Sequence, residues 1–176
     1  MVRVRECGLE GVRCFETDSF EDFRGRYREI YHQQIYGQLG ANVEFVQDDI
    51  SRSSRGVLRG IHGDDKTWKL ISCLYGRFYL VVVNNDPDSA QFQQWESFTL
   101  SDTNGLQVLI PPKFGNGHLV MSEEAIFHYK QSTYYQGASA QFTIPWDDPM
   151  FRIWWPIANP ILSQRDQTGD ASFVKP

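Results

Sequence analysis

Short apolar segments rich in Val, Ile, Tyr, Phe and Trp recur along the chain, and each is closed by turn-forming residues. Brief strands separated by frequent reversals are typical of an antiparallel β barrel or sandwich. We expect about ten or eleven strands. The clearest are Val43–Asp49, Val57–Ile61, Trp68–Leu74, Arg77–Val83, Trp95–Leu100, Leu106–Ile110, Gly117–Met121, Ile126–Tyr134 and Phe142–Ile144.

Turn signals rich in Asn, Asp, Gly and Pro separate these segments, at 84–89, 101–105 and 146–149. Helical spacing occurs only over Tyr31–Leu39, where Ile35 and Leu39 stand four apart. The chain also lacks the glycine-rich phosphate loops of parallel α/β folds. The pattern therefore predicts an all-β jelly-roll barrel with short peripheral helices.

Chain length, net charge and cysteine content limit the classes of protein to which this chain can belong. A chain of 176 residues fits a single domain, 1–176. Its net charge of −5 disfavours a nucleic-acid partner, and its longest apolar run is far below the ~20 residues of a membrane span. Three cysteines without a C-x-x-C pair disfavour a disulfide framework and a thiolate zinc site. We expect a cytoplasmic protein without a membrane partner.

Ionisable residues are densest over 55–70, around His62. Strict alternation would place Leu58 and Gly60 on the same strand face as His62, and Arg59 and Ile61 on the other face. Taken alone, His62 reads as a core or rim histidine. The four histidines form no H-x-H pair, so the sequence predicts no metal.

Several separated motifs resemble one family. They are Phe20–Gly25, Phe45–Asp48, Arg59–His62, Lys69–Leu70, Phe127–Lys130, Trp146–Pro149, Trp155–Pro156 and Pro160–Asp166, and they span nearly the whole chain. Their order and residues are similar to those of the dTDP-4-dehydrorhamnose 3,5-epimerase family. The resemblance implies a metal-free, cofactor-independent cupin jelly roll. It also implies a homodimer that exchanges N-terminal strands and acts on a nucleotide-linked 4-keto sugar.

The resemblance gives four residues catalytic roles. A carbonyl at carbon 4 acidifies the protons on carbons 3 and 5, so epimerisation needs a base, an acid on the opposite face and a cation for the enolate. By position, His62 is the base, Asp166 fixes its tautomer, Lys69 is the cation and Tyr129 is the acid. Without the family, Lys69 would be read as a solvated surface charge and Tyr129 as a barrel-wall aromatic.

The resemblance also gives residues that contact the rest of the substrate. Arg59 and Arg24 match positions suited to the diphosphate, and Arg24 is expected to act across a dimer interface. Phe20, Glu29 and Gln47 match contacts to the base and its sugar, although plain packing and a surface charge are equally good readings of Phe20 and Glu29. Either Tyr134 or Tyr135 is a weaker candidate for sugar contact.

The chain departs from the family pattern around the expected site. Gly63 replaces an aromatic residue after His62, the following loop is short, and Asn116 replaces a second histidine. His118 lies two residues beyond Asn116, on the same strand face. These features resemble a subgroup acting on GDP-linked 4-keto-heptoses for capsular polysaccharide or lipopolysaccharide. Gly63 and the short loop are expected to leave room for a bulkier base or sugar.

The function predicted is epimerisation at carbon 3, carbon 5 or both, with Asn116 and His118 counted among the substrate-binding residues. A 3,4-ketoisomerase and a non-catalytic sugar-nucleotide-binding module are the alternatives. Tyr129 together with Asp166 favours the epimerase over the ketoisomerase. An acid and a base on opposed faces are more than a binding module requires.

Overall fold

The computed structural model describes residues 1–170 and 172, and nearly all regular structure in them is β-strand. The strands are β1 (Val2–Arg5), β2 (Arg13–Thr17), β3 (Phe20–Asp22), β4 (Gly25–Tyr27), β5 (Gln47–Ser54), β6 (Leu58–Gly63), β7 (Lys69–Tyr75), β8 (Arg77–Asn84), β9 (Trp95–Ser101), β10 (Leu106–Ile110), β11 (Phe114–Val120), β12 (Glu124–Gln131) and β13 (Phe142–Thr143). The helices are α1 (Gln33–Gln38), the 3-10 turn η1 (Ala138–Ala140) and α2 (Gln164–Thr168).

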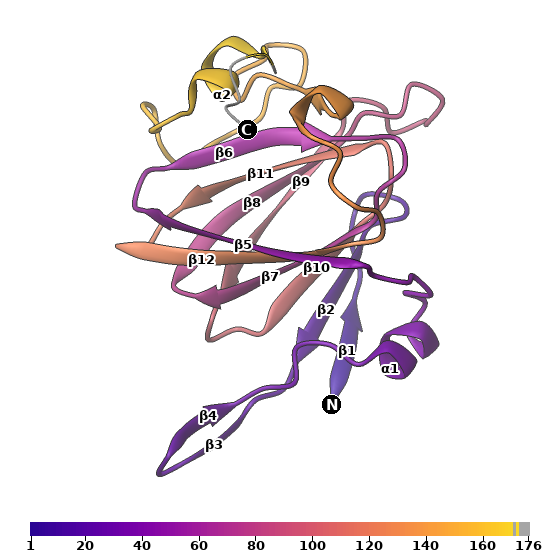
Figure 1. Ribbon diagram of the computed structural model, residues 1–176, viewed down its shortest axis with the longest axis vertical. Coiled ribbons are helices and arrows are strands. Elements are labelled where there is room, and N and C mark those ends of the chain that lie inside the picture. The colour runs from indigo at the N-terminus through magenta and orange to yellow at the C-terminus, as the bar shows by residue number, and fades with distance from the viewer. Residues whose placement is uncertain (171, 173–176) are drawn as a thin grey trace.

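Two antiparallel sheets form the body of the molecule (Figure 1). The six-stranded sheet has the order β1-β2-β10-β7-β12-β5, and the five-stranded sheet has the order β13-β6-β11-β8-β9. The strands β3 and β4 make a separate two-stranded hairpin that projects away from both sheets. The predicted all-β jelly roll is confirmed, as two facing sheets that do not join into one closed barrel.

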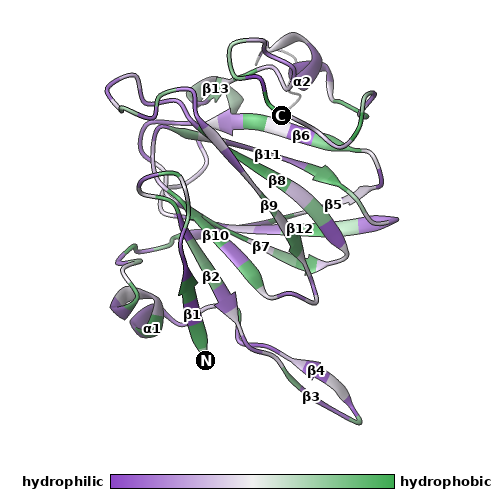
Figure 2. Cartoon of the chain, turned by 180° about the vertical axis from the view of Figure 1, so that it is seen from behind, coloured by the Kyte–Doolittle hydropathy of each residue, from purple (hydrophilic) through white to green (hydrophobic). Residues whose placement is uncertain are grey.

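Three clusters of buried apolar side chains hold the two sheets and the segments that cover them together. The largest lies between the sheets and includes Ile71, Phe78, Leu100 and Val108. A second covers the outer face of the five-stranded sheet with the chain that follows β13, and a third covers the six-stranded sheet beneath α1. Figure 2 shows the hydrophobic positions gathered along the strands, while much of the connecting chain is hydrophilic. Apolar burial therefore holds both sheets on both faces.

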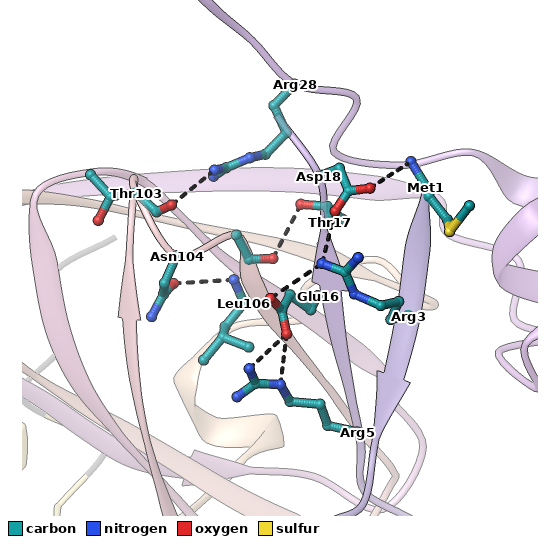
Figure 3. Close-up of polar contacts among 11 residues, drawn as sticks. Met1, Arg3, Arg5, Glu16, Thr17, Asp18, Arg28, Thr103, Asn104 and Leu106 are labelled. Atoms are coloured by element: carbon teal, nitrogen blue, oxygen red, sulfur yellow. Dashed lines mark hydrogen bonds and ion pairs between the residues drawn. The ribbon is translucent and has the colours of Figure 1, made fainter. Parts of the chain in front are cut away.

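Ion pairs fasten β1 to β2 at the edge of the six-stranded sheet (Figure 3). The Arg3 guanidinium lies 2.8 Å from the Asp18 carboxylate, and the Arg5 guanidinium lies 2.7 Å from that of Glu16. Arg28, at the base of the hairpin, donates to the carbonyl oxygen of Thr103 at 3.3 Å. Exposed pairs of this kind contribute roughly 0–1 kcal/mol each, so they orient the edge more than they stabilise it.

Most predicted elements lie where the pattern placed them, with shifted ends. The helix expected over Tyr31–Leu39 is the shorter α1. The strand expected at Val43–Asp49 is wrong in position, because β5 runs over Gln47–Ser54. Its exposed residues alternate with partly buried ones, and its order comes from pairing with β12 rather than from apolar side chains.

Candidate active site

A cavity of about 450 Å³ opens between the two sheets. Strands β6 and β11 line it from the five-stranded sheet, β5, β7 and β12 line it from the six-stranded sheet, and the chain around α2 also contributes. Seven of its lining residues are among those predicted from the sequence: Arg59, His62, Lys69, Asn116, His118, Tyr129 and Asp166. Residues 104 positions apart in the chain are thereby brought into contact.

A register shift in β6 sets the direction of its side chains. Asn116 pairs with His62, whereas His118 pairs with Arg59, so β6 carries an extra residue at this point. Arg59 and His62 consequently both line the cavity, while Leu58 and Ile61 are buried in the outer cluster. The predicted strict alternation is wrong, because the bulge, where Gly60 has a φ of 115°, resets the period of two.

His62 and Asp166 form a hydrogen-bonded pair. The Nε2 atom of His62 lies 2.7 Å from Oδ1 of Asp166, whose other oxygen accepts from the Ser163 hydroxyl at 2.8 Å. Burial raises the pKa of the Asp166 carboxyl, but hydrogen bonds from His62 and Ser163 outweigh it and hold that pKa below its ordinary value. An ionised Asp166 keeps a proton on Nε2 of His62, which leaves Nδ1 as the basic nitrogen.

The imidazole of His62 stays neutral at neutral pH. Burial lowers its pKa below the ordinary value of 6.5, and the Asp166 carboxylate offsets only part of that shift. Lys69 stands on β7, in the facing sheet, with its ammonium donating to Oδ1 of Asn116 at 3.5 Å. Burial lowers the pKa of Lys69 to about 8, so it remains a cation at neutral pH. The cavity thus holds a neutral base and a buried positive charge.

Tyr129 reaches the cavity from the other sheet. It lies on β12, lines the same cavity and is partly buried, and burial raises the pKa of its phenol to about 12. At neutral pH it is therefore a protonated group. Because β6 and β12 belong to different sheets, His62 and Tyr129 line the cavity from different sheets.

Positive charge surrounds the cavity at two further points. Arg59 is exposed, and its Nε donates to the Ser53 hydroxyl on β5 at 3.0 Å. Arg165 is buried, with two guanidinium nitrogens donating to the Thr143 hydroxyl at 3.0 and 2.9 Å. With Asp166 committed to His62, these cations give the cavity the charge that a diphosphate requires.

Gly63 does not open space as expected. A Cβ atom built at Gly63 would lie 2.3 Å from the Phe114 carbonyl oxygen and 2.4 Å from the Phe142 ring. Neighbouring protein atoms therefore occupy the space that a side chain at residue 63 would fill, because β13 pairs closely with β6 at this residue. The prediction that Gly63 makes room for substrate is wrong.

Four predicted binding residues are not among those that line the cavity. Phe20 and Arg24 belong to the hairpin region, where the Arg24 guanidinium pairs with Asp22, and Glu29 is exposed just beyond β4. Gln47 comes closer, since its side-chain carbonyl accepts from the backbone N–H of Tyr135, a lining residue, at 2.9 Å. Of the two tyrosines weighed for sugar contact, the cavity includes Tyr135 rather than Tyr134.

Comparison with known proteins assigns the chain to a family. The family model described as dTDP-4-dehydrorhamnose 3,5-epimerase matches residues 6–172. The chain belongs to that family. It is 38% identical over 172 residues to the dTDP-4-dehydrorhamnose 3,5-epimerase of Shigella flexneri, covering 96% of this chain and 94% of the relative. The sequence-based prediction of an isomerase-class epimerase is confirmed.

Solved structures of the family agree with the fold. The dTDP-6-deoxy-D-glucose-3,5-epimerase of Legionella pneumophila, in complex with dTDP-4-keto-L-rhamnose, superposes with a TM-score of 0.91 at 33% identity, covering 99% of this chain and 97% of that one. A 4-keto-6-deoxy sugar epimerase from Streptomyces spheroides gives 0.91 at 31% identity, covering 96% and 86%.

Sequence reasoning missed part of this epimerase-family cavity. Arg165 and Ser163 had a signal, because both lie within the motif that ends at Asp166, and Ser163 caps α2 three residues before Asp166. Phe127 likewise begins the motif Phe127–Lys130, whereas Gln141 lies outside every motif. The remaining lining residues outside the prediction are Ile50 and Ser51.

Neither a metal cluster nor a spanning helix is found in the described residues. No three His, Cys, Asp or Glu side chains of residues 1–170 and 172 gather where they could hold a metal ion. Within the same residues, no helix has the length and apolar character needed to cross a membrane.

Proposed function

We propose that the protein inverts carbon 3, carbon 5 or both of a nucleotide-linked 4-keto sugar. One observation carries this: His62, paired with Asp166, and a protonated Tyr129 line one cavity from different sheets, and the buried Lys69 lines the same cavity. Epimerisation requires a base on one side of the ring and an acid on the other. Family membership supports the same reaction.

The proposed steps balance as proton transfers. Nδ1 of His62 takes a proton from the carbon next to the carbonyl, and the electron pair moves onto the carbonyl oxygen as an enolate. The ammonium of Lys69 stabilises that oxygen. The Tyr129 hydroxyl then donates its proton to the other face of the carbon, leaving a tyrosinate. Solvent returns that proton to Tyr129 and removes the one on His62, and the reaction uses no cofactor.

The diphosphate is assigned to Arg59 and Arg165, whose guanidinium groups line the cavity. A homodimer supplies the rest of the site in this proposal. The hairpin projects from the sheets and carries exposed Phe20 and Arg24. We assign Phe20, Arg24 and Glu29 to the nucleotide in the cavity of the partner subunit, and Gln47 to the rim of its own cavity.

The finer substrate assignment rests on the subgroup features. A GDP-linked 4-keto-heptose for capsular polysaccharide or lipopolysaccharide is proposed from Asn116 and the short loop after His62. An amide at position 116 can orient a hydroxyl or keto oxygen, but it does not titrate near neutral pH. A cytoplasmic location stays a prediction of the sequence.

The test is proton NMR in heavy water with dTDP- and GDP-linked 4-keto sugars. We expect loss of the signals at carbon 3, carbon 5 or both, which identifies the centres inverted. A 3-keto product would instead indicate the ketoisomerase. Nucleotide binding without any exchange would indicate the binding module, and either result overturns the proposal.

Two variants test which residue performs each proton transfer. His62→Asn should abolish exchange at both carbons while nucleotide binding persists, because the cations that hold the diphosphate are intact. Tyr129→Phe should slow completed inversion more than proton removal, since His62 can still form the enolate. Equal loss of exchange and inversion in Tyr129→Phe would make Tyr129 a structural residue.

A further inference from the structure

His118 is the second histidine of the cavity, and its ring is held in one orientation. It stands on β11 and stacks on Phe127 with ring centroids 4.0 Å apart and planes 8° from parallel. Phe78 packs against it at 5.3 Å. Only 3% of the residue is exposed. Two aromatic rings thus fix an imidazole that lines the cavity.

The polar edge of this ring lacks a protein partner. The Nε2 atom of His118 is buried and has no hydrogen bond within the described part of the chain. Buried polar atoms in proteins are nearly always paired, because leaving one unpaired costs about as much as its desolvation. His62, on the neighbouring strand, has Asp166, whereas no carboxylate of residues 1–170 and 172 is hydrogen-bonded to His118. A buried, unpaired nitrogen on a residue that lines the cavity points to a ligand group.

Electrostatics restricts what that ligand group can be. Burial, reinforced by the nearby Arg59 and His62, lowers the pKa of His118 to about 3. The ring is therefore neutral, with one nitrogen donating and the other accepting. A neutral ring adds no charge for a phosphate, and with its pKa lowered to about 3 His118 is too weak a base to take a proton from the substrate. A neutral group that both donates and accepts, such as a hydroxyl, matches it.

We propose that His118 hydrogen-bonds a hydroxyl of the substrate's sugar, so that the enzyme selects 4-keto sugars that carry this hydroxyl over deoxy sugars that lack it. The inference rests on the proposed function of the cavity and adds a specificity determinant to it. It assigns His118 to substrate choice rather than to proton transfer.

The test uses unreactive ligands that differ by single hydroxyls. Nucleotide-linked glucose and its 2-, 3- and 6-deoxy analogues have no ketone, so calorimetric titration measures binding without turnover. The wild type should bind one deoxy analogue roughly tenfold more weakly than the parent, the size expected when a buried polar group loses its partner. His118→Phe, which keeps the aromatic stack, should bind that analogue and the parent equally.

A second histidine provides the matched control. His128 is also buried and also has an unpartnered ring nitrogen, but it is not among the cavity residues. His128→Phe should therefore keep the wild-type discrimination. The same parent-to-deoxy ratios in wild type and His118→Phe, for all three analogues, would overturn the proposal.

A measurement on the unaltered protein covers the case in which His118→Phe does not fold. The imidazole nitrogen resonances of His118 should shift when the parent ligand binds and stay near their free positions with the discriminating analogue. Equal shifts with every ligand would overturn the assignment. Proton exchange in heavy water is scored separately, so failure of His118 as a selector and failure of the epimerase proposal give different results.

Discussion

At the scale of residues, the candidate site depends on groups whose charge is set by burial. Burial lowers the pKa of Lys69 to about 8 and that of His62 below 6.5, and it raises the pKa of Tyr129 to about 12. Near neutral pH the cavity therefore holds a cation, a neutral base and a protonated acid together. No one of these states needs a metal or cofactor to maintain it.

This arrangement predicts a bell-shaped pH profile with an alkaline limb near pH 8. Lys69 is charged below its lowered pKa, so enolate stabilisation is present below about pH 8 and is lost as pH rises through that value. The acid limb reports His62 and should fall below pH 6.5, since His62 must be neutral to accept a proton. The measurement is kcat/KM between about pH 5 and 10.

The variant Lys69→Met tests whether Lys69 is the group that produces the alkaline limb. Its kcat should fall roughly 10²–10³-fold, as when one oxyanion-stabilising donor is removed, and its profile should lack the limb near pH 8. Lys113→Met is the matched control, because Lys113 pairs with Asp86 away from the cavity. Persistence of the limb at pH 8 in Lys69→Met would assign it to another group.

The sequence predicted Arg59, His62, Lys69, Tyr129 and Asp166 as site residues because they stand in family motifs. It predicted Asn116 and His118 because they mark a departure from the family pattern. It did not predict that His118 is stacked on Phe127, since that contact joins β11 to β12 across the two sheets. Nor did it predict that Phe142 occupies the space beside Gly63. Both are tertiary contacts with no local signal.

At the scale of elements, the bulge in β6 positions two cavity residues. It turns Arg59 and His62 toward the same cavity while Leu58 and Ile61 stay in the outer cluster. Strict alternation predicted otherwise, because a pattern of single residues does not show where an extra residue enters a ladder. Strand β5 was misplaced for a related reason, since its residues are polar and its order comes from pairing with β12.

Gly60→Ala should disturb this element. The added Cβ would lie 2.5 Å from Cα of Gly117 and 2.6 Å from the Asn116 carbonyl oxygen, at a φ of 115°. The bulge would have to shift, so we expect the free energy of unfolding to fall by roughly 1–3 kcal/mol or more and proton exchange to fall with it. Thermal unfolding and the heavy-water assay measure the two effects.

Gly25→Ala separates steric contact from backbone strain. Gly25 has nearly the same φ, 121°, but nothing lies within 4 Å of an added Cβ on the hairpin. It should lower the melting temperature less than Gly60→Ala does. Equal losses would place the whole cost in the backbone angle and leave the close approach of β6 and β11 without a role in stability.

At the scale of the whole molecule, one chain supplies the proposed chemistry but not every proposed nucleotide contact. The two sheets enclose the cavity, while the hairpin with Phe20 and Arg24 extends away from them. Phe23 at its tip is 98% exposed. The family resemblance predicted both the hairpin residues and a dimer, and their separation from the cavity is what a contribution to a partner's cavity requires.

Mixing two defective homodimers tests that contribution. His62→Asn removes the base of a subunit's own cavity, and Arg24→Ala removes a contact proposed for the partner's cavity. After subunit exchange, each mixed dimer holds one complete site, built from His62 of one subunit and Arg24 of the other. Activity should rise above the sum of the two parents, toward about a quarter of the wild-type value when subunits mix at random.

The control for this experiment places both substitutions in one chain. Mixed with wild type, that double variant leaves every mixed dimer without a complete site, because the intact base then lacks Arg24 and the intact Arg24 serves a cavity without a base. Activity in this mixture should fall below half of the undiluted wild type, since mixed dimers form at the expense of active ones. If Arg24 instead served its own cavity, the first mixture would gain nothing and the second would keep one complete site in each mixed dimer.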